Sequence, residues 1–105
     1  MTQAQHLLHL LQQLSPLMDS LGLWQQEPPS LEALSSQEPF SVDTLRPEQW
    51  LQWEFIPKMQ ALIEQQGQIP KGFSITPYFF SECWKEHTEY GPLLTLLASI
   101  DEVCA

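Results

Sequence analysis

Apolar residues recur at helical spacing in three separate stretches of this chain, and this repeat constrains its fold more than any other feature. The stretches cover residues 3–21, 51–63 and 93–103. Within each stretch the apolar side chains follow one another at intervals that place them on one face of an α-helix. The three sets are Leu7, Leu10, Leu11, Leu14, Leu17, Met18 and Leu21; Leu51, Phe55, Ile56, Met59, Leu62 and Ile63; and Leu93, Leu96, Leu97, Ile100 and Val103. The pattern predicts three amphipathic helices.

Proline and glycine residues indicate where these helices begin and end. Pro47 suits the first position of a central helix, which we expect to end at Gly67. Gly22 is expected to end the first helix. Pro16 projects opposite the apolar stripe of that helix, so we expect a bend there rather than a break.

A fourth helix is predicted to begin at Thr76 and Pro77, which are typical of an N-cap and a first helical position. Tyr90, Gly91 and Pro92 should separate it from the last helix. Its inner face is expected to carry Phe79, Phe80, Cys83, Trp84 and His87.

Two proline-rich connections join the predicted helices. Residues 25–43 contain three prolines and many turn-forming residues, with Ser30 placed to cap a short helical piece that reaches Leu34. Phe40 and Val42 are expected to anchor this connection to the body of the protein. Residues 67–75 form the second connection, in which a short hairpin is an alternative. We therefore predict a single all-α domain over residues 1–105, a bundle of four main helices wrapped by two loops.

Composition narrows the classes of function. The chain of 105 residues has 43% hydrophobic residues, enough for one core, and no apolar run long enough to span a bilayer. Four Lys and Arg residues against thirteen Asp and Glu residues give a net charge of −9, which disfavours direct binding of nucleic acid. The charge favours a basic protein partner, although acidity also keeps a small protein in solution. No targeting segment is evident, so we expect a cytoplasmic protein.

Pro57 lies inside the predicted central helix, within the run WLQWEFIPKM. It has no N–H for the carbonyl group of Trp53, so we expect a kink that changes the phase of the two helix halves. Trp50 and Trp53 fall outside the apolar arc of a straight helix. One interpretation is that both rings pack beneath the Phe40 loop or the last helices. The other is that they form a partly exposed anchor for another protein.

Two runs in the middle of the chain are EPFSVDTLRPEQWLQWEFIPKMQALIE, at residues 38–64, and IPKGFSITPYFF, at residues 69–80. They resemble the core signature of the YqcC-like family of small bacterial helical proteins. The matching residues are Pro39, Phe40, Asp43, Thr44, Trp50, Leu51, Gln52, Trp53, Ile56, Pro57, Met59, Pro70, Phe73, Pro77 and Tyr78. The resemblance implies an all-helical fold, a cytoplasmic location and no established activity. It also implies a link, through gene neighbourhood, to a tRNA pseudouridine synthase.

The candidates for catalysis or metal binding are few. Cys83 and His87 are four residues apart, and Cys104 is a possible third ligand, but a buried thiol and a core histidine explain this pattern better. Asp43 is expected to cap the central helix or to bind the amides of the loop before it, rather than to act as an acid or base. We expect no metal, no cofactor and no enzyme activity.

The sequence therefore predicts a non-enzymatic interaction protein that acts through its acidic surface and a patch at Trp50 and Trp53. The motif residues Asp43, Pro57 and Tyr78 complete the candidate site. One alternative is a small-molecule pocket lined by Trp53, Phe80 and Trp84. Another is a homodimer that buries spare apolar surface such as Leu94.

Overall fold

Helices joined by long connections make up the described chain. The computed structural model describes residues 2–66, 69 and 71–105, and no strand occurs among them. The α-helices are α1 (Gln3–Ser20), α2 (Leu31–Leu34), α3 (Pro47–Trp50), α4 (Ile56–Gln66), α5 (Thr76–Tyr78) and α6 (Gly91–Val103). Two π-helical turns, η2 (Leu51–Phe55) and η3 (Phe79–Cys83), and two 3₁₀ turns, η1 (Pro39–Ser41) and η4 (Thr88–Tyr90), lie between them. The predicted all-α fold is confirmed.

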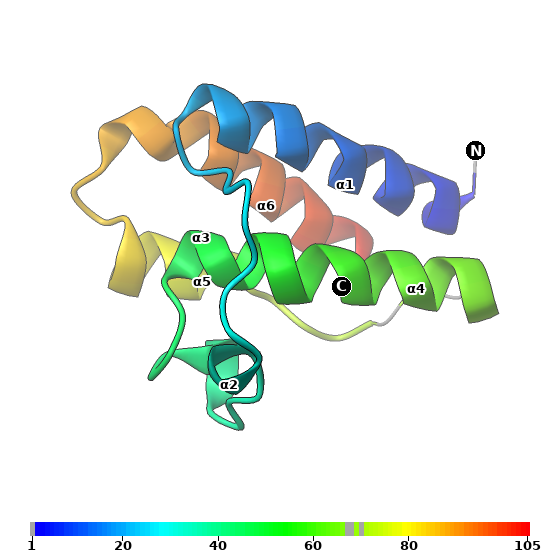
Figure 1. Cartoon of the computed structure of the whole chain (residues 1–105). Helices are drawn as coiled ribbons and strands as arrows, with labels where there is room; N and C mark the ends of the chain where they lie inside the picture. The colour runs from blue at the N-terminus through cyan, green and yellow to red at the C-terminus, as the bar shows by residue number, and fades with distance from the viewer. Residues whose placement is uncertain (1, 67–68, 70) are drawn as a thin grey trace.

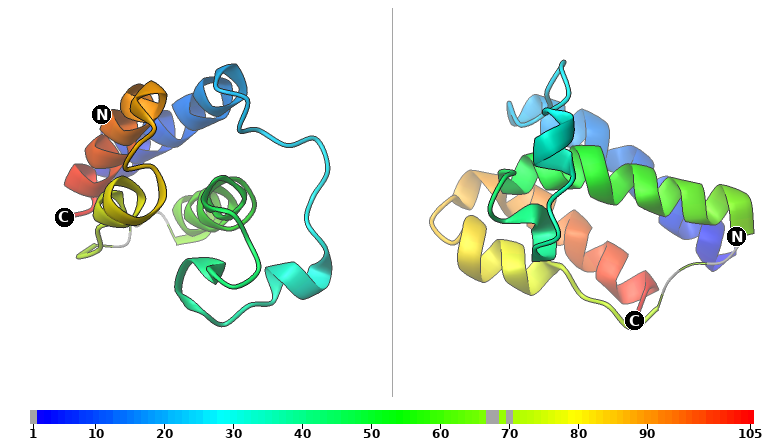
Figure 2. Two further views of the ribbon diagram at one scale, coloured as in Figure 1. Left: turned by 90° about the vertical axis from the view of Figure 1, so that its left-hand side faces the viewer. Right: turned by 60° about the horizontal axis from the view of Figure 1, so that its bottom comes forward.

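Four helical rods form the body of the described chain. Helices α1 and α6 lie along each other, and α3, η2 and α4 follow one another as a single rod, called the central helix below (Figure 1). Helix α5, continued by η3, packs against α6. The connection from α1 to α3 swings out around the central helix and carries α2 (Figure 2). Among the described residues, no helix is long and apolar enough to cross a membrane.

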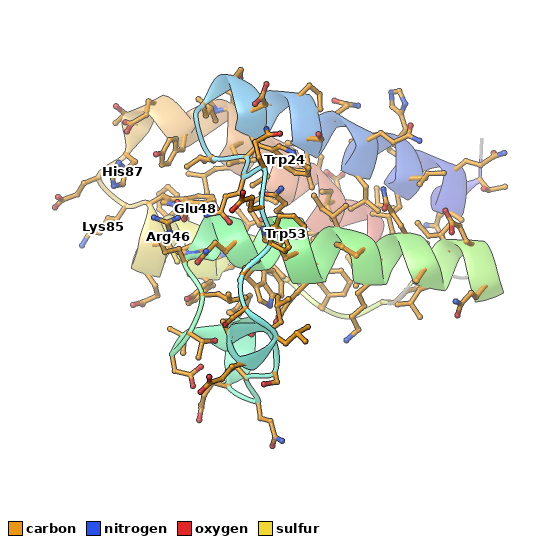
Figure 3. The ribbon with its side chains drawn as sticks, viewed as in Figure 1. Trp24, Arg46, Glu48, Trp53, Lys85 and His87 are labelled. Carbon is orange, nitrogen blue, oxygen red and sulfur yellow. The ribbon has the colours of Figure 1, made fainter. Side chains whose placement is uncertain are left out.

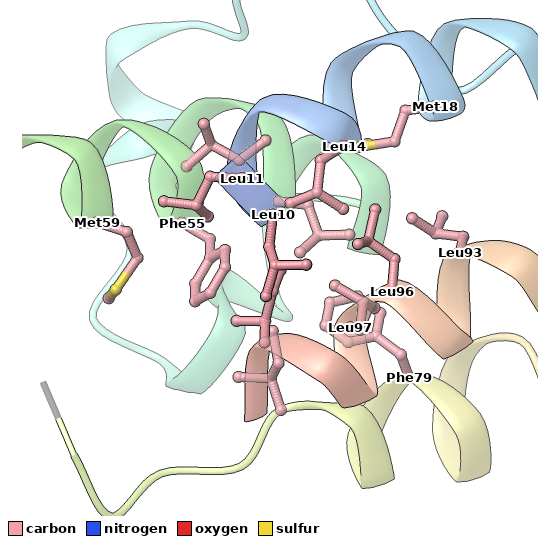
Figure 4. Close-up of a cluster of buried hydrophobic side chains, with 14 of the residues drawn as sticks. Leu10, Leu11, Leu14, Met18, Phe55, Met59, Phe79, Leu93, Leu96 and Leu97 are labelled. Atoms are coloured by element: carbon pink, nitrogen blue, oxygen red, sulfur yellow. The ribbon is translucent and has the colours of Figure 1, made fainter. Parts of the chain in front are cut away.

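The predicted apolar stripes meet in one core. Leu7, Leu14 and Met18 of α1 are completely buried, as are Leu93 and Leu97 of α6. Phe55 enters this cluster from the central helix and Phe79 from η3 (Figure 4). Burial of each such side chain contributes about 1.5–3 kcal/mol, so the shared core holds the four rods together.

The first helix forms as the sequence predicts. The Thr2 hydroxyl accepts a hydrogen bond from the Gln5 N–H at 3.1 Å, and the Gln5 side chain accepts one from the Thr2 N–H at 3.0 Å. This capping box satisfies two donors that would otherwise have no partner. Pro16 lies within the helix and is exposed, as expected. Gly22 follows the helix with a φ of 75°, a left-handed conformation that favours glycine.

The inner face predicted for the fourth helix is partly wrong. Phe79 and Trp84 are buried, but 61% of Phe80 is exposed and His87 is also exposed. The physical reason is the π-helical turn, in which the Trp84 N–H bonds to the Phe79 carbonyl at 2.8 Å. The wider turn changes the angular spacing of the residues within it, and the helix then ends. His87 therefore lies beyond the helix rather than on its inner face.

An acceptor on α6 supplies the cap of α5. The Asp101 carboxylate accepts hydrogen bonds from the N–H groups of Ile75 and Thr76 at 2.9 Å and 2.8 Å. Ile75, not Thr76, occupies the N-cap position, so the predicted Thr76 cap is wrong. The carboxylate satisfies backbone donors at the start of the helix and complements the positive end of its dipole.

The long connection between α1 and α3 is ordered by its own contacts. Ser30 caps α2 as predicted, because its hydroxyl accepts a hydrogen bond from the Ala33 N–H at 3.1 Å. Phe40 is half-buried and packs against the core, which confirms one predicted anchor. Val42 is 58% exposed, so the other predicted anchor is wrong. The 3₁₀ turn beside it brings Phe40 and Ser41 into left-handed conformations, with φ values of 58° and 47°, and this changes the direction of the chain.

The second connection runs without a strand through its described residues. Ile75 is buried, while Ile69 and Phe73 are half-buried and pack against the core. The predicted helix end at Gly67 and the motif residue Pro70 lie outside the described residues.

Candidate interaction groove around Trp53

The chain accommodates Pro57 by forming a π-helical turn immediately before it. In η2 the Ile56 N–H bonds to the carbonyl of Leu51, five residues earlier. The expected distortion is therefore present, but as a wide turn inside a continuous rod and not as a sharp kink (Figure 1). The wide turn changes the phase of the two helix halves, so Trp50 and Trp53 point to different surroundings.

Trp50 belongs to an aromatic cluster against the core. Its ring centroid lies 4.8 Å from Phe40, 5.3 Å from Phe55 and 6.0 Å from Phe79. These separations are typical of favourable ring contacts. The Trp50 ring therefore packs against Phe40, as the first of the two interpretations expects for it.

Trp53 instead faces the start of the connection that follows α1. Its indole N–H donates to the Gln25 side-chain oxygen at 3.2 Å. Figure 3 shows Trp24 and Trp53 where this connection crosses the central helix. Trp53 is half-buried. The two tryptophans that the sequence groups together therefore do not form one patch.

A glutamine clamp fixes this crossing. The Gln52 side chain accepts a hydrogen bond from the Gln25 N–H at 2.8 Å and donates one to the Gln25 carbonyl at 2.7 Å. Only 5% of Gln52 is exposed, and its buried amide is satisfied by these two bonds. The Gln49 amide also reaches the Gln25 side chain, at 3.4 Å. Gln52 is among the residues that carry the family resemblance, but sequence reasoning missed its pairing with Gln25, because nothing in the local pattern pairs a loop residue with a helix residue so distant in the chain.

The clamp forms part of the wall of a groove of about 580 Å³ between α1, the connection and the central helix. Its lining consists of Leu11, Gln12, Ser15, Trp24, Gln25, Gln26, Gln52, Trp53, Ile56, Pro57 and Gln60. No residue in this lining is charged, although thirteen acidic residues occur in the chain. Indole faces offer apolar contact, and glutamine amides can both donate and accept hydrogen bonds. Such a surface is suited to a neutral, partly apolar part of another molecule.

The remaining predicted site residues lie elsewhere. Asp43 neither caps the central helix nor binds loop amides in the described chain; it accepts a hydrogen bond from the Ser36 hydroxyl. At the start of the central helix the Gln49 side chain accepts from the Arg46 N–H at 2.7 Å and takes part of the expected role of Asp43. The aspartate instead ties the two sides of the connection together.

Tyr78 stacks on Phe40, with ring centroids 4.0 Å apart. Burial, together with the neighbouring Cys83 thiol, raises the pKa of Tyr78 to about 12. This ring contact joins the first connection to α5.

The aromatic pocket expected from Trp53, Phe80 and Trp84 is not formed. Trp84 is buried against Phe79, with ring centroids 4.9 Å apart, whereas Phe80 is exposed and Trp53 lines the groove. A different hollow of about 440 Å³ lies between the central helix and the second connection. Its lining is Phe40, Trp50, Glu54, Phe55, Lys58, Met59, Leu62, Phe73, Ser74 and Ile75.

The cysteines and His87 do not form a cluster. His87 pairs on the surface with Glu89 at 3.0 Å, and this hydrogen bond lowers the pKa of Glu89. Burial raises the pKa of the Cys83 thiol and of the Cys104 thiol. Among the described residues no group of three or more His, Cys, Asp or Glu side chains could hold a metal ion.

These features define a small all-α domain with an uncharged groove between its first connection and its central helix. Residues 6–103 match the family model DUF446, which is described as tRNA pseudouridine synthase C. An uncharacterized protein of Haemophilus influenzae is 48% identical over 93 residues, covering 89% of this chain and 87% of that protein. The chain is 30% identical over 95 residues to the uncharacterized protein YqcC of Escherichia coli, covering 90% of this chain and 87% of YqcC. The chain belongs to this YqcC-like family.

The solution NMR structure of YqcC from Escherichia coli has the same fold. It aligns with a TM-score of 0.88 at 30% sequence identity and covers 100% of this chain and 90% of that one. A protein of Pectobacterium carotovorum named tRNA pseudouridine synthase C is 50% identical over 50 residues. That match covers 48% of this chain and 13% of the Pectobacterium protein.

Proposed function

We propose that this chain is a non-enzymatic protein-interaction domain of the cytoplasm and that its partner is a tRNA pseudouridine synthase. The observation that carries the proposal is the match to 13% of the Pectobacterium protein of that name. In the Pectobacterium protein, a segment related to this chain is part of the same polypeptide as the rest of the synthase. The covalent link keeps the segment and the synthase at a high effective concentration. Where the related segment is a separate chain, a non-covalent contact would serve the same purpose.

The charge of the chain supports such a partner. A protein that acts on tRNA needs basic surface to bind phosphates, and a chain with a net charge of −9 is complementary to basic surface. The chemistry of the groove supports a role in binding as well, because its lining offers indole rings and amides and no carboxylate pair. Trp is among the residues most often responsible for affinity in interfaces.

Isothermal titration calorimetry of the purified chain with the tRNA pseudouridine synthase C of the same organism tests the proposal. We expect a one-to-one complex with a Kd of about 1 μM or lower. Trp53→Ala should weaken the complex by at least about tenfold, which corresponds to about 1.4 kcal/mol. Phe80→Ala, which removes an exposed aromatic ring from another face, is the control and should leave the Kd unchanged.

The absence of binding at micromolar concentrations would contradict the proposal. Circular dichroism of both variants must show the helical content of the wild-type chain, so that a loss of binding reports the removed ring and not a lost fold.

A second candidate function, the binding of a small apolar ligand, is favoured by the hollow that Phe40, Trp50, Phe55 and Phe73 line. Its volume of about 440 Å³ is within the usual range for ligand sites. A fluorescent probe with an apolar body, anilinonaphthalene sulfonate, should bind the folded chain, and Met59→Trp should block it by filling the hollow. Equal binding by both proteins would contradict this second candidate.

A further inference from the structure

The connection between α1 and α3 carries a separate exposed feature, the α2 lobe, which we define as residues 27–44. It contains α2 and η1 and lies apart from the layer formed by α1 and α6 (Figures 1 and 2). The Gln25 clamp holds the connection at its entry to the lobe, and Phe40 holds the far side of the lobe against Tyr78.

Hydrogen bonds make the lobe a fixed shape. The Thr44 hydroxyl donates to the Ala33 carbonyl at 2.7 Å, and the Ser36 hydroxyl donates to Asp43. The Ser41 hydroxyl donates to the Glu54 carboxylate of the central helix at 2.9 Å. A surface that is ordered before binding loses little conformational freedom when a partner binds, so such a lobe is suited to recognition.

Apolar side chains project from this lobe into solvent. Leu31 is 86% exposed and Val42 is 58% exposed. Among the described residues, Phe80 is the only other large apolar side chain that is exposed. Single exposed apolar residues are common on protein surfaces, but these two lie on one small lobe.

All the charged residues of the lobe are acidic. Glu27, Glu32, Glu38 and Asp43 are all exposed. From Gln25 to Leu45 the sequence contains no Lys, Arg or His residue. The four basic residues Arg46, Lys58, Lys71 and Lys85 all come later in the chain. Exposed carboxylates around an apolar side chain are complementary to a hollow rimmed by Lys or Arg.

Resting on the proposed function, we infer that the α2 lobe docks on a basic surface of the synthase, where an apolar hollow rimmed by Lys or Arg receives Leu31. The partner is argued from charge complementarity: an enzyme of tRNA carries basic surface, and the lobe is a preformed acidic one. The uncharged groove begins at Gln25 and Gln26, immediately before the lobe, so one partner can cover both. The groove then supplies neutral contacts and the lobe supplies the charge.

The test compares charge reversals at two places in the chain by calorimetry with the same synthase. Glu27→Lys with Glu38→Lys changes the lobe, and Glu64→Lys with Glu102→Lys makes the same change of net charge on exposed positions of α4 and α6. At about 0.1 M salt the lobe variant should bind at least about tenfold more weakly than the wild type, and the control variant less than about threefold. At about 1 M salt, where the Debye length is about 3 Å, the difference between the two variants should disappear.

Leu31→Ala tests the apolar contact independently of charge. It should weaken binding about tenfold at both salt concentrations, because apolar burial is not screened, while Phe80→Ala should have no effect. Equal effects of the lobe and control charge variants, together with no effect of Leu31→Ala, would overturn the inference and leave the proposed function intact. No binding by the wild-type chain would overturn both.

Discussion

Replacing Gln52 with alanine gives a sharp test of the structure, because this one buried side chain makes two of the hydrogen bonds that hold the first connection on the central helix. The substitution removes the hydrogen bond from the Gln25 N–H and the one to the Gln25 carbonyl, which are 2.8 Å and 2.7 Å long. Each such bond contributes about 1 kcal/mol net, so the expected loss in the free energy of unfolding is about 2 kcal/mol. For a domain of this size the melting temperature should fall by about 10 °C.

The assay is urea and thermal unfolding followed by circular dichroism, with Gln60→Ala as the matched control. Gln60 lies on the same helix and lines the same groove, but it makes no side-chain hydrogen bond within the described chain. Gln60→Ala should lower the free energy of unfolding by less than about 0.5 kcal/mol. Gln52→Glu should also be less stable than the wild-type chain. Its carboxylate keeps an acceptor for the Gln25 N–H but puts a second oxygen where Gln52 has its donor. Equal stability of Gln52→Ala and Gln60→Ala would refute the clamp.

Four other predictions concern the core, the α5 cap, a buried hydroxyl and alkaline pH. Leu14→Ala, at a completely buried position, should cost about 3 kcal/mol in urea unfolding, whereas exposed Pro16→Ala should not destabilise the chain. Asp101→Ala should cost about 2 kcal/mol and increase hydrogen exchange at the Ile75 and Thr76 amides, an effect that exposed Glu102→Ala should not have. Thr76→Val should raise the melting temperature slightly, since the buried Thr76 hydroxyl has no hydrogen-bond partner within the described chain; a loss of stability would contradict this reasoning. The pKa of Tyr78 is raised from 10.0 to about 12, so the folded state holds that proton more tightly than the unfolded state does. The free energy of unfolding should therefore fall as the pH rises from 10 to 12, and it should fall less steeply in Tyr78→Phe.

Much of the fold could be predicted from the sequence because its helices bury regular apolar stripes. Leu7, Leu14 and Met18 are buried at the spacing that defines α1, and Leu93 and Leu97 repeat this for α6. The π-helical turns could not be predicted, because spacing arguments assume a constant turn. This is why Phe80 lies in solvent and why the distortion before Pro57 is a wide turn.

The candidate site was predictable only in part. The apolar spacing indicates that Trp50 and Trp53 do not follow the main stripe, and the structure places the two rings in different environments. The partners Gln25 and Gln52 are far apart in the chain, and glutamine has no spacing signal that pairs such residues. The role of Asp101 as the cap of α5 could not be predicted either, because it depends on a contact between residues far apart in the chain.

The homodimer hypothesis relied on spare apolar surface at Leu94, but Leu94 is half-buried and packs against the core. The exposed large apolar side chains among the described residues are Leu31, Val42 and Phe80, and two of them lie on the α2 lobe. Self-association stays a prediction that sedimentation can test.

Fluorine NMR of the chain labelled with fluorotryptophan tests most directly whether the groove around Trp53 is the contact surface for the synthase. The four tryptophans give separate probes, assigned by single Trp→Phe variants, and the synthase is left unlabelled. On addition of the synthase we predict that the Trp53 and Trp24 signals shift and lose their solvent isotope effect, while that of buried Trp84 stays unchanged. A mixture in which the Trp53 and Trp24 signals do not change at saturating synthase would contradict the account.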